Sequence, residues 1–152
     1  MKKAIFPGSF DPITKGHEAL VNRALELFDE IIIAIGTNSS KKYMFTLEER
    51  IDFIKQTFKG NPKVKVETYE GLTIEYCKKS GCKFMLRGLR TSADFEFERA
   101  ISQINRELDN SIESVFLITS PELSAINSSI VRDIIKNNGD ASIFLPESLK
   151  IK

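Results

Sequence analysis

Apolar residues along this chain fall into two alternating kinds of segment. Five short runs are continuously apolar or alternate with polar residues, and they hold many β-branched and aromatic side chains, which is typical of strands. These runs cover residues 4–6, 30–35, 64–69, 83–86 and 114–118. Between them, apolar residues recur every three or four positions, the spacing of one helix face. The predicted helices cover residues 18–28, 47–58, 72–79, 93–108 and 130–136, with a short one after Phe144-Leu-Pro146.

Capping residues support two of these helices. Thr46-Leu-Glu-Glu49 is a capping box, in which the threonine and glutamate side chains each accept from a free backbone N–H group of the first turn. Asn127-Ser128-Ser129 can cap the last helix in a similar way. Pro7, Gly8 and Pro12 are expected to end the first strand and to form an irregular turn before the first helix.

Strands and helices therefore alternate along the whole chain, without internal repeats, low-complexity segments or an obvious linker. This order is typical of a parallel sheet joined by right-handed helical crossovers. We therefore expect an α/β fold: a single Rossmann-like domain over residues 1–152, with a five-stranded, mostly parallel sheet and helices on both faces.

Composition and charge narrow the class of protein. The chain has 152 residues, 41% of them apolar and 28% charged, and a net charge of +1, which predicts no broad field for nucleic acid. No apolar stretch approaches the roughly 20 residues that a membrane span needs. The N-terminus runs into strand-like sequence without the apolar core of a signal peptide, so we expect a cytoplasmic protein. Cys77 and Cys82 are then reduced thiols, with a regulatory disulfide as the alternative.

The chemically distinctive residues follow the predicted strands. Ligands of open parallel sheets bind outside the carboxyl ends of the strands, so side chains there are candidates for one common site. In chain order, the candidates are Ser9, His17, Lys41, Thr73, Arg87, Arg90, Ser128 and Ser129. Cationic groups and hydroxyls gathered at one edge suit a polyphosphate. The single histidine, His17, follows Gly16 at a helix start, where free N–H groups and the helix dipole favour phosphate.

Each candidate also has a purely structural interpretation. His17 could be a helix-start residue exposed to water, and Ser128-Ser129 could serve only as a cap. Lys41 adjoins Lys42, and spacing alone does not choose between them. The guanidinium groups of Arg87 and Arg90 can bind separate phosphates through paired N–H donors. Alternatively, they can form a structural network with the nearby carboxylates Asp94, Glu96 or Glu98.

Several common catalytic motifs are missing from the sequence. Gly8 stands alone in its loop, and neither G-x-G-x-x-G nor G-x-x-x-x-G-K-S/T occurs. There is no H-E-x-x-H motif or cluster with metal-ligand spacing, and a single histidine leaves few candidates for covalent catalysis. A reaction that depends on the placement of reactants and on stabilisation of charge is the class that remains.

The candidate residues fall within motifs of a known family. Residues 7–17, Pro-Gly-Ser-Phe-Asp-Pro-Ile-Thr-Lys-Gly-His, end in Thr-x-Gly-His and resemble the signature of nucleotidyltransferases that share their fold with class I aminoacyl-tRNA synthetases. More narrowly, the chain resembles bacterial phosphopantetheine adenylyltransferases over nearly its full length. The further matching segments are residues 40–42, 44–50, 86–90, 93–98, 113–117 and 144–147.

The resemblance implies transfer of the adenylyl group of ATP to 4′-phosphopantetheine, which gives dephospho-coenzyme A and pyrophosphate. It implies that the phosphopantetheine side is held by Ser9, Lys41, Thr73 and Arg87, with Lys41 matching the family lysine rather than Lys42. The implied ATP site comprises Ser9, Phe10, His17, Gly88, Leu89, Arg90, Glu98, Leu123, Ser124, Ala125, Ile126, Asn127, Ser128 and Ser129.

The implied mechanism is an in-line attack of the 4′-phosphate on the α-phosphorus of ATP, without a covalent enzyme intermediate. The catalytic residues would be His17 and Lys41, which stabilise charge on the α-phosphoryl oxygens, and Arg90, which binds the leaving pyrophosphate. Mg²⁺ would be the cofactor, bound mainly by phosphates rather than by a protein metal site. The resemblance also implies a hexamer built from two trimers and feedback inhibition by coenzyme A.

Departures from the family pattern are few, and two other functions stay open. Phe6 stands where the family often has tyrosine, and Asn127 replaces the first serine of a common Ile-Ser-Ser-Ser run. Leu123 and Ala125 occupy positions that are sometimes aromatic in relatives. The first alternative function is a sibling nucleotidyltransferase that uses CTP or another acceptor. The second is a non-catalytic regulator that binds coenzyme A or a nucleotide.

Overall fold

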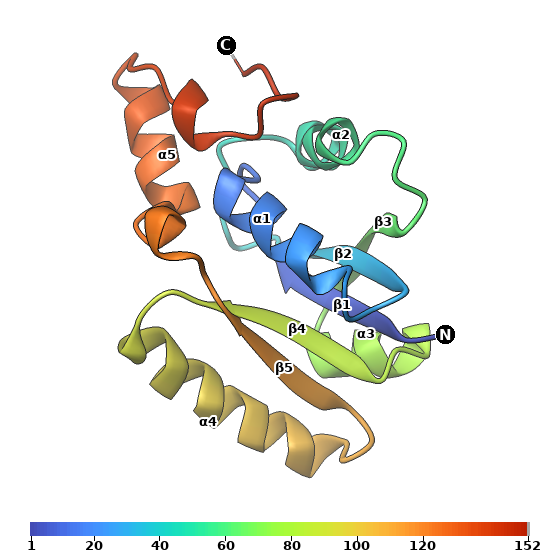
Figure 1. The fold of residues 1–152 in the computed structure, drawn as a ribbon. Helices are drawn as coiled ribbons and strands as arrows, with labels where there is room; N and C mark the ends of the chain where they lie inside the picture. Colours follow the sequence, from blue (N-terminus) through green and yellow to red (C-terminus); the bar gives the residue numbers. More distant parts are fainter. Residues whose placement is uncertain (152) are drawn as a thin grey trace.

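The five strands lie in the order β3-β2-β1-β4-β5, and each pairs in parallel with its neighbour (Figure 1). This computed structural model describes residues 1–151; Lys152, the last residue of the expected domain, lies outside them. The strands are β1 (Lys3–Gly8), β2 (Glu30–Thr37), β3 (Val64–Glu70), β4 (Phe84–Leu89) and β5 (Glu113–Ile118). The helices are α1 (Lys15–Ala24), α2 (Leu47–Thr57), α3 (Thr73–Ser80), α4 (Ser92–Leu108) and α5 (Ser128–Lys136), with 3₁₀ turns η1 (Pro121–Leu123) and η2 (Ser142–Phe144).

The side chains of the central strands alternate between two cores, because successive residues of a strand point to opposite faces of the sheet. On one face, Phe6, Ile31 and Ile33 pack with residues of α1 and α2. On the other face, Ile5 and Ile32 pack with residues of α3. The predicted α/β class with helices on both faces is therefore confirmed, and the described sheet is wholly parallel.

Two boundaries near the first loop differ from the prediction. The strand β1 continues through Pro7 to Gly8, because both residues still pair with β2. The helix α1 begins at Lys15, earlier than expected, because Thr14 caps it in a capping box whose second member is His17. The helix start therefore depends on the histidine that the sequence singled out.

The expected C-terminal helix is wrong. The chain forms the 3₁₀ turn η2 before Pro146, and residues 145–151 contain no helix. Leu145 and Leu149 are each buried, and they pack into two different apolar clusters. Anchoring at both points favours a partly extended path, and an isolated segment this short gains little from helix formation.

The sheet opens between β1 and β4 toward their carboxyl ends. β1 pairs with β2 over its whole length, but with β4 only at Ala4 and Ile5. Pro7 has no backbone N–H to donate to a ladder. Its carbonyl accepts instead from the Arg87 side chain, with Nη1 at 3.1 Å. This opening lies where the strand order reverses, the usual position of ligand sites in such sheets.

The helix α4 runs beside β4 and β5 (Figure 1). It keeps a row of apolar side chains at the surface. The apolar face expected for residues 93–108 exists, but it is not buried within the chain. Phe97 is 67% exposed and Ile104 63% exposed, with Ile101 and Leu108 on the same row. Glu98 is the buried residue of this helix.

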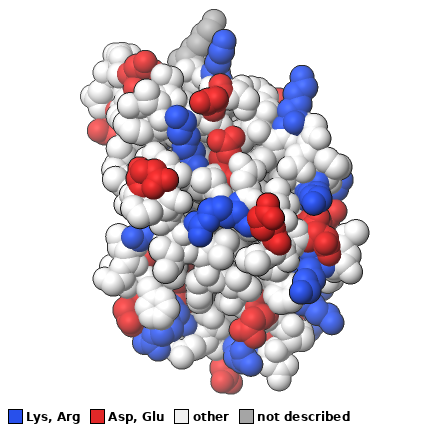
Figure 2. Space-filling view, in the orientation of Figure 1, with Lys and Arg blue, Asp and Glu red and all other residues white. Residues whose placement is uncertain are grey.

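The surface charge, helix hydropathy and cysteines agree with the composition of the chain. Figure 2 shows basic and acidic side chains interspersed over the face in view, in keeping with the net charge of +1. Within residues 1–151, no helix has the length and hydropathy of a transmembrane segment. Cys77 and Cys82 are free and buried, and burial raises the pKa of the Cys77 thiol to about 12. A protonated, buried thiol is a poor nucleophile, so these cysteines pack as apolar residues.

Candidate active site

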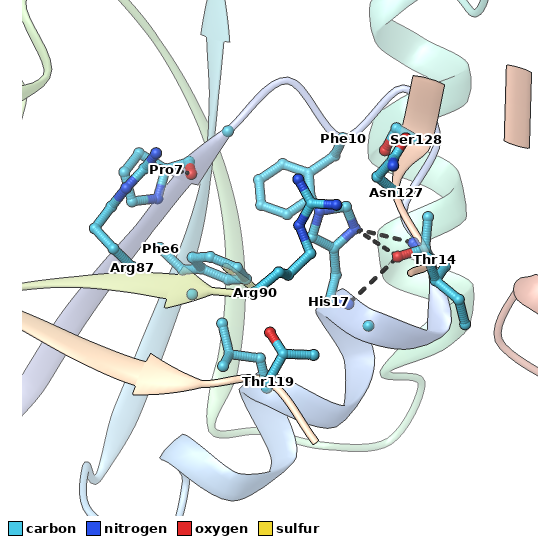
Figure 3. Close-up of a pocket in the computed structure, with 15 residues that line it drawn as sticks. Phe6, Pro7, Phe10, Thr14, His17, Arg87, Arg90, Thr119, Asn127 and Ser128 are labelled. Carbon is cyan, nitrogen blue, oxygen red and sulfur yellow. Dashed lines mark hydrogen bonds between the residues drawn. The ribbon is translucent and has the colours of Figure 1, made fainter. Parts of the chain in front are cut away.

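Two cavities meet at the opening between β1 and β4. The first, of about 240 Å³, lies on the α1 side of the sheet (Figure 3). Its lining residues are Phe6, Pro7, Gly8, Phe10, Thr14, Gly16, His17, Leu20, Arg87, Gly88, Arg90, Thr119, Ile126, Asn127 and Ser128. No carboxylate is among them, whereas two guanidinium groups are. A cavity of this composition favours an anionic ligand.

The second cavity, of about 250 Å³, lies on the face covered by α3 and α4. Pro7 and Arg87 line both cavities, so Arg87 stands in the wall between them. Thr73, at the start of α3, lines the second cavity, and its hydroxyl forms a hydrogen bond of 2.7 Å with the Tyr69 hydroxyl. Thr73 and Arg87, which the resemblance assigns to the same substrate, therefore line the same cavity.

His17 is fixed by the first turn of α1. The backbone N–H of Thr14 donates to His17 Nδ1 at 3.0 Å, and the His17 N–H points back to Thr14 Oγ1 at 3.4 Å (Figure 3). Since Nδ1 accepts, the proton of the neutral imidazole is on Nε2. The Phe10 ring packs against the imidazole with 4.9 Å between centroids. The capping interaction thus selects one tautomer and leaves one donor.

The charge of His17 differs from one sequence expectation. Burial, and then the nearby positive charge of Arg90, lower the pKa of His17 from 6.5 to about 4. The His17 imidazole, expected among the groups that carry positive charge to the phosphates, is therefore neutral at neutral pH. It can stabilise an oxyanion as a hydrogen-bond donor, and the positive charge in the cavity comes from the arginines.

Arg87 and Arg90 each line the first cavity and also pair with a carboxylate of α4. Arg87 forms two hydrogen bonds with the Glu98 carboxylate, at 2.6 and 3.0 Å. Arg90 lies 3.6 Å from Asp94, whose carboxylate also accepts from the Arg90 backbone N–H. The structural network that the sequence allowed therefore exists, and both arginines nevertheless line the first cavity.

Lys41 is brought to the loop that follows β1, although 32 residues separate it from that loop. Its Nζ donates to Ser9 Oγ at 3.1 Å, and it lies 5.4 Å from the centre of the Tyr43 ring. This contact favours Lys41 over its neighbour Lys42, a choice that spacing could not make. Ser9 and Lys41 are not among the residues that line either cavity.

The last helix contributes its N-terminus to the first cavity. Asn127 caps α5 by accepting from the Ile130 N–H at 2.9 Å, so the departure from the family serine keeps the cap. Ser128 Oγ donates to the Pro12 carbonyl at 2.9 Å, and Ile126, Asn127 and Ser128 line the cavity.

Several expected nucleotide-site residues lie elsewhere. Glu98 lines the second cavity instead of the first, because its carboxylate is paired with Arg87. Ser129 Oγ accepts from Arg132 at 3.1 Å. Besides Glu98, the expected nucleotide-site residues that do not line the first cavity are Ser9, Leu89, Leu123, Ser124, Ala125 and Ser129.

Three charged residues that the sequence analysis did not select hold the loop after β1. Arg50 donates to the Ser9 carbonyl at 3.0 Å, and Arg132 donates to the Asp11 carbonyl at 2.8 Å. The Asp11 carboxylate is buried and accepts from two backbone N–H groups. One signal was available: Arg50 precedes Ile54 by four residues, so it occupies the apolar face of its helix. Thr119, at the carboxyl end of β5, was also detectable by its position.

Comparisons with known proteins show which sequences this chain resembles. A family model described as cytidylyltransferase-like matches residues 5–134. A Flavobacterium psychrophilum protein is 60% identical over 152 residues, with 100% of both chains covered. A Bacteroides thetaiotaomicron protein is 47% identical, with 99% of both chains covered. Both carry the name phosphopantetheine adenylyltransferase.

Solved structures share the fold at low sequence identity. A bifunctional NMN adenylyltransferase/ADP ribose pyrophosphatase from Francisella tularensis matches with a TM-score of 0.75 at 15% identity. The match covers 97% of this chain and 46% of that one, so this chain spans about half of its length. A second structure of such a protein, complexed with AMP and a Mn ion, matches with a TM-score of 0.70 at 16% identity.

The single histidine allows the electrostatics to be measured directly. In a ¹⁵N NMR titration, we expect the His17 imidazole to carry its proton on Nε2 at neutral pH and to titrate with a midpoint of about 4. Because the unfolded chain protonates near 6.5, the free energy of unfolding should decrease as the pH falls from 6.5 to 4. Arg90→Gln should raise the midpoint by removing a positive charge, and Arg99→Gln on exposed α4 surface should not. A midpoint near 6.5, or a proton on Nδ1, would contradict this description.

Proposed function

Because this chain belongs to the phosphopantetheine adenylyltransferases of the cytidylyltransferase-like family, we propose that it transfers the adenylyl group of ATP to 4′-phosphopantetheine. The products are dephospho-coenzyme A and pyrophosphate, a step of coenzyme A synthesis. The observation that carries this proposal is the pair of cavities that share Arg87 as a common wall. Two reactants bound on either side of that wall would meet at the opening of the sheet.

We assign the first cavity to ATP. Its lining combines Arg90, the N–H-rich start of α5 at Asn127 and Ser128, and no carboxylate, which suits the phosphates. Gly88 also lines this cavity, and its missing side chain lets α1 pack closely on β4, since a Cβ there would meet Leu20 at 2.9 Å. The segment 123–126 leads into this helix start and would pass the adenine, although only Ile126 of it lines the cavity itself.

We assign the second cavity to the pantetheine arm. Thr73, Arg87 and Glu98 line it together with apolar residues such as Ile74 and Phe116. An amide-containing, partly apolar chain suits this mixture of polar and apolar groups. Arg87 keeps N–H groups beyond those given to Glu98 and Pro7, and these can bind the 4′-phosphate at the wall.

In the proposed reaction an oxygen of the 4′-phosphate attacks the α-phosphorus of ATP, and the bond from that phosphorus to the bridging oxygen breaks in line. No covalent enzyme intermediate forms, so the protein aligns reactants and stabilises charge. His17 Nε2 donates to an α-phosphoryl oxygen, and the Lys41 ammonium lies beside Ser9 to neutralise the same charge. Phe10 and Ser9 stand at the junction of the substrates, and Arg90 binds the departing pyrophosphate.

We propose Mg²⁺ as the divalent cation. Among residues 1–151, no group of three or more His, Cys, Asp or Glu side chains is arranged to hold a metal. The cavity assigned to ATP has no carboxylate either, so Mg²⁺ would be held by the substrate phosphates and keep most of its waters. When bound, it would supply additional positive charge to the phosphates.

The same assignment extends to regulation and location. Coenzyme A contains both a pantetheine arm and an adenine nucleotide, so it would occupy both cavities and act as a feedback inhibitor. We place the enzyme in the cytoplasm, where its substrates and the reduced state of Cys77 and Cys82 are expected. Residues 1–152 form one catalytic domain in this proposal.

Pyrophosphate release from ATP, Mg²⁺ and 4′-phosphopantetheine tests the function. Wild-type protein should release pyrophosphate, and Lys41→Ala should lower kcat about 100-fold, the usual effect of removing one stabilising group from the transition state. Lys42→Ala is the matched control, because it removes the adjacent exposed cation, and it should stay within about twofold of wild type, as surface changes usually do.

The control reactions separate the other two functions. Faster turnover with CTP, or with a different phosphate acceptor, would show a sibling nucleotidyltransferase. Tight binding of coenzyme A without turnover would show a regulator. Equal activity of Lys41→Ala and wild type would refute the role of Lys41 while leaving the reaction itself in place.

We further propose that the chain forms a homo-oligomer, a hexamer by family resemblance, through α4. Phe97, Ile101, Ile104 and Leu108 follow one another at intervals of four, three and four residues, which places them in one row. All four are exposed in the isolated chain. A second copy of this face would bury them.

Light scattering with size-exclusion chromatography tests the assembly. Wild-type protein should elute as an oligomer, and Ile104→Glu should shift it toward monomer, because a carboxylate would then be buried between apolar faces. Glu107→Gln, three residues along the same helix, should leave the mass unchanged. A monomeric wild type, or an Ile104→Glu variant that stays assembled, would contradict this interface.

A further inference from the structure

Arg50 is a buried cation without a carboxylate partner. It is 3% exposed, and no Asp or Glu of the described residues lies within ion-pair distance of it. Its donors go to backbone carbonyls instead: Nη1 to Ser9 at 3.0 Å and Nε to Phe45 at 3.2 Å. The guanidinium also lies 4.0 Å from the centre of the Tyr43 ring. A buried charge with such partners joins the loop after β1 to the segment before α2.

Asp11 joins the same two segments from the other side. It is also 3% exposed, and its two carboxylate oxygens accept from the N–H groups of Met44 and Phe45, each at 2.9 Å. Phe45 is therefore held at both ends, its N–H by Asp11 and its carbonyl by Arg50. Charge-assisted hydrogen bonds of this kind are stronger than neutral ones.

The segment held in this way carries Lys41. The hydrogen bonds in the stretch just before it are local ones, from Ser40 and Lys41 to Asn38. Lysine has a long flexible side chain, so the position of its ammonium depends on where its backbone is held. Arg50 contacts both the Ser9 carbonyl and the segment that follows Lys41. It thereby acts on both partners of the contact between Lys41 Nζ and Ser9 Oγ.

We propose that Arg50 and Asp11 are positioning residues, which hold the Lys41 ammonium against Ser9 at the reacting phosphate. Both side chains are buried and pair with backbone groups of the protein, so we assign neither of them a contact with substrate. This inference rests on the proposed adenylyl transfer, because only there does Lys41 act on a phosphate. If Arg50 and Asp11 only stabilised the fold, their substitution would slow the reaction by the same factor whether or not Lys41 is present.

A double-mutant cycle separates the two roles. Arg50→Met keeps much of the side-chain volume and removes the hydrogen bonds to the Ser9 and Phe45 carbonyls. In single-turnover assays at high enzyme concentration, Arg50→Met should slow adenylyl transfer about tenfold, since a displaced catalytic group can lose up to about 100-fold. In the Lys41→Ala background the same substitution should change the rate by less than about twofold, because groups that act through one another are not additive.

The control is Lys55→Met, which removes an exposed cation from the same helix, and it should have no effect in either background. An equal loss from Arg50→Met with and without Lys41 would overturn the proposal. Should Arg50→Met fail to fold, as judged by circular dichroism, Asp11→Asn enters the same cycle with the same expectation. That variant keeps the shape of the side chain but offers an amide N–H group where one backbone donor needs an acceptor.

Hydrogen exchange gives a readout that does not need activity. Asp11→Asn should accelerate amide exchange at Met44 and Phe45 and leave the amides of β2 unchanged. Unchanged exchange at these two amides would overturn the proposal even if the enzyme is active. If wild-type protein transferred no adenylyl group, the proposed function would fail, and accelerated exchange would still support the anchoring of the Lys41 segment.

Discussion

The loop between β1 and α1 depends on arginine side chains that come from three distant elements. The loop carbonyls of Ser9 and Asp11 accept from Arg50 of α2 and Arg132 of α5, and the carbonyl of Pro7, at the end of β1 just before the loop, accepts from Arg87 of β4. A loop has no ladder or helix to satisfy its polar groups, and leaving them unpaired in a protein interior is unfavourable. Planar guanidinium groups supply fixed, charged donors. The shape of this loop is therefore set by contacts across the whole domain.

The chemistry of the site follows from that arrangement. The loop delivers Ser9 and Phe10 to the opening between β1 and β4, and it ends at Thr14, which caps α1 and fixes the tautomer of His17. Arg87 both supports the end of β1, where the loop begins, and separates the two cavities. The first cavity has a neutral donor in His17, two arginines and no carboxylate. This combination stabilises negative charge that develops on a phosphate. No residue needs to react covalently in such a site.

Much of this was predictable from the sequence, because strands and helices alternate with clear periodicity and ligands gather at strand ends. His17, Arg87, Arg90 and the cap at Asn127 were found in this way. Other features depend on contacts that have no local signal. Spacing does not choose between Lys41 and Lys42; the family resemblance implies Lys41, and only the structure shows its hydrogen bond to Ser9, 32 residues away. Likewise, periodicity showed that α4 has an apolar face, but not that the chain leaves this face uncovered.

A crystal structure with dephospho-coenzyme A tests the central claim most directly, since this product spans both halves of the site. The account predicts that its adenosine lies in the cavity beside Asn127 and its pantetheine arm in the cavity beside Thr73. The phosphate derived from the ATP α-phosphate should then accept a hydrogen bond from His17 Nε2. A product bound away from the opening between β1 and β4, or a His17 that contacts no phosphate, would contradict the account.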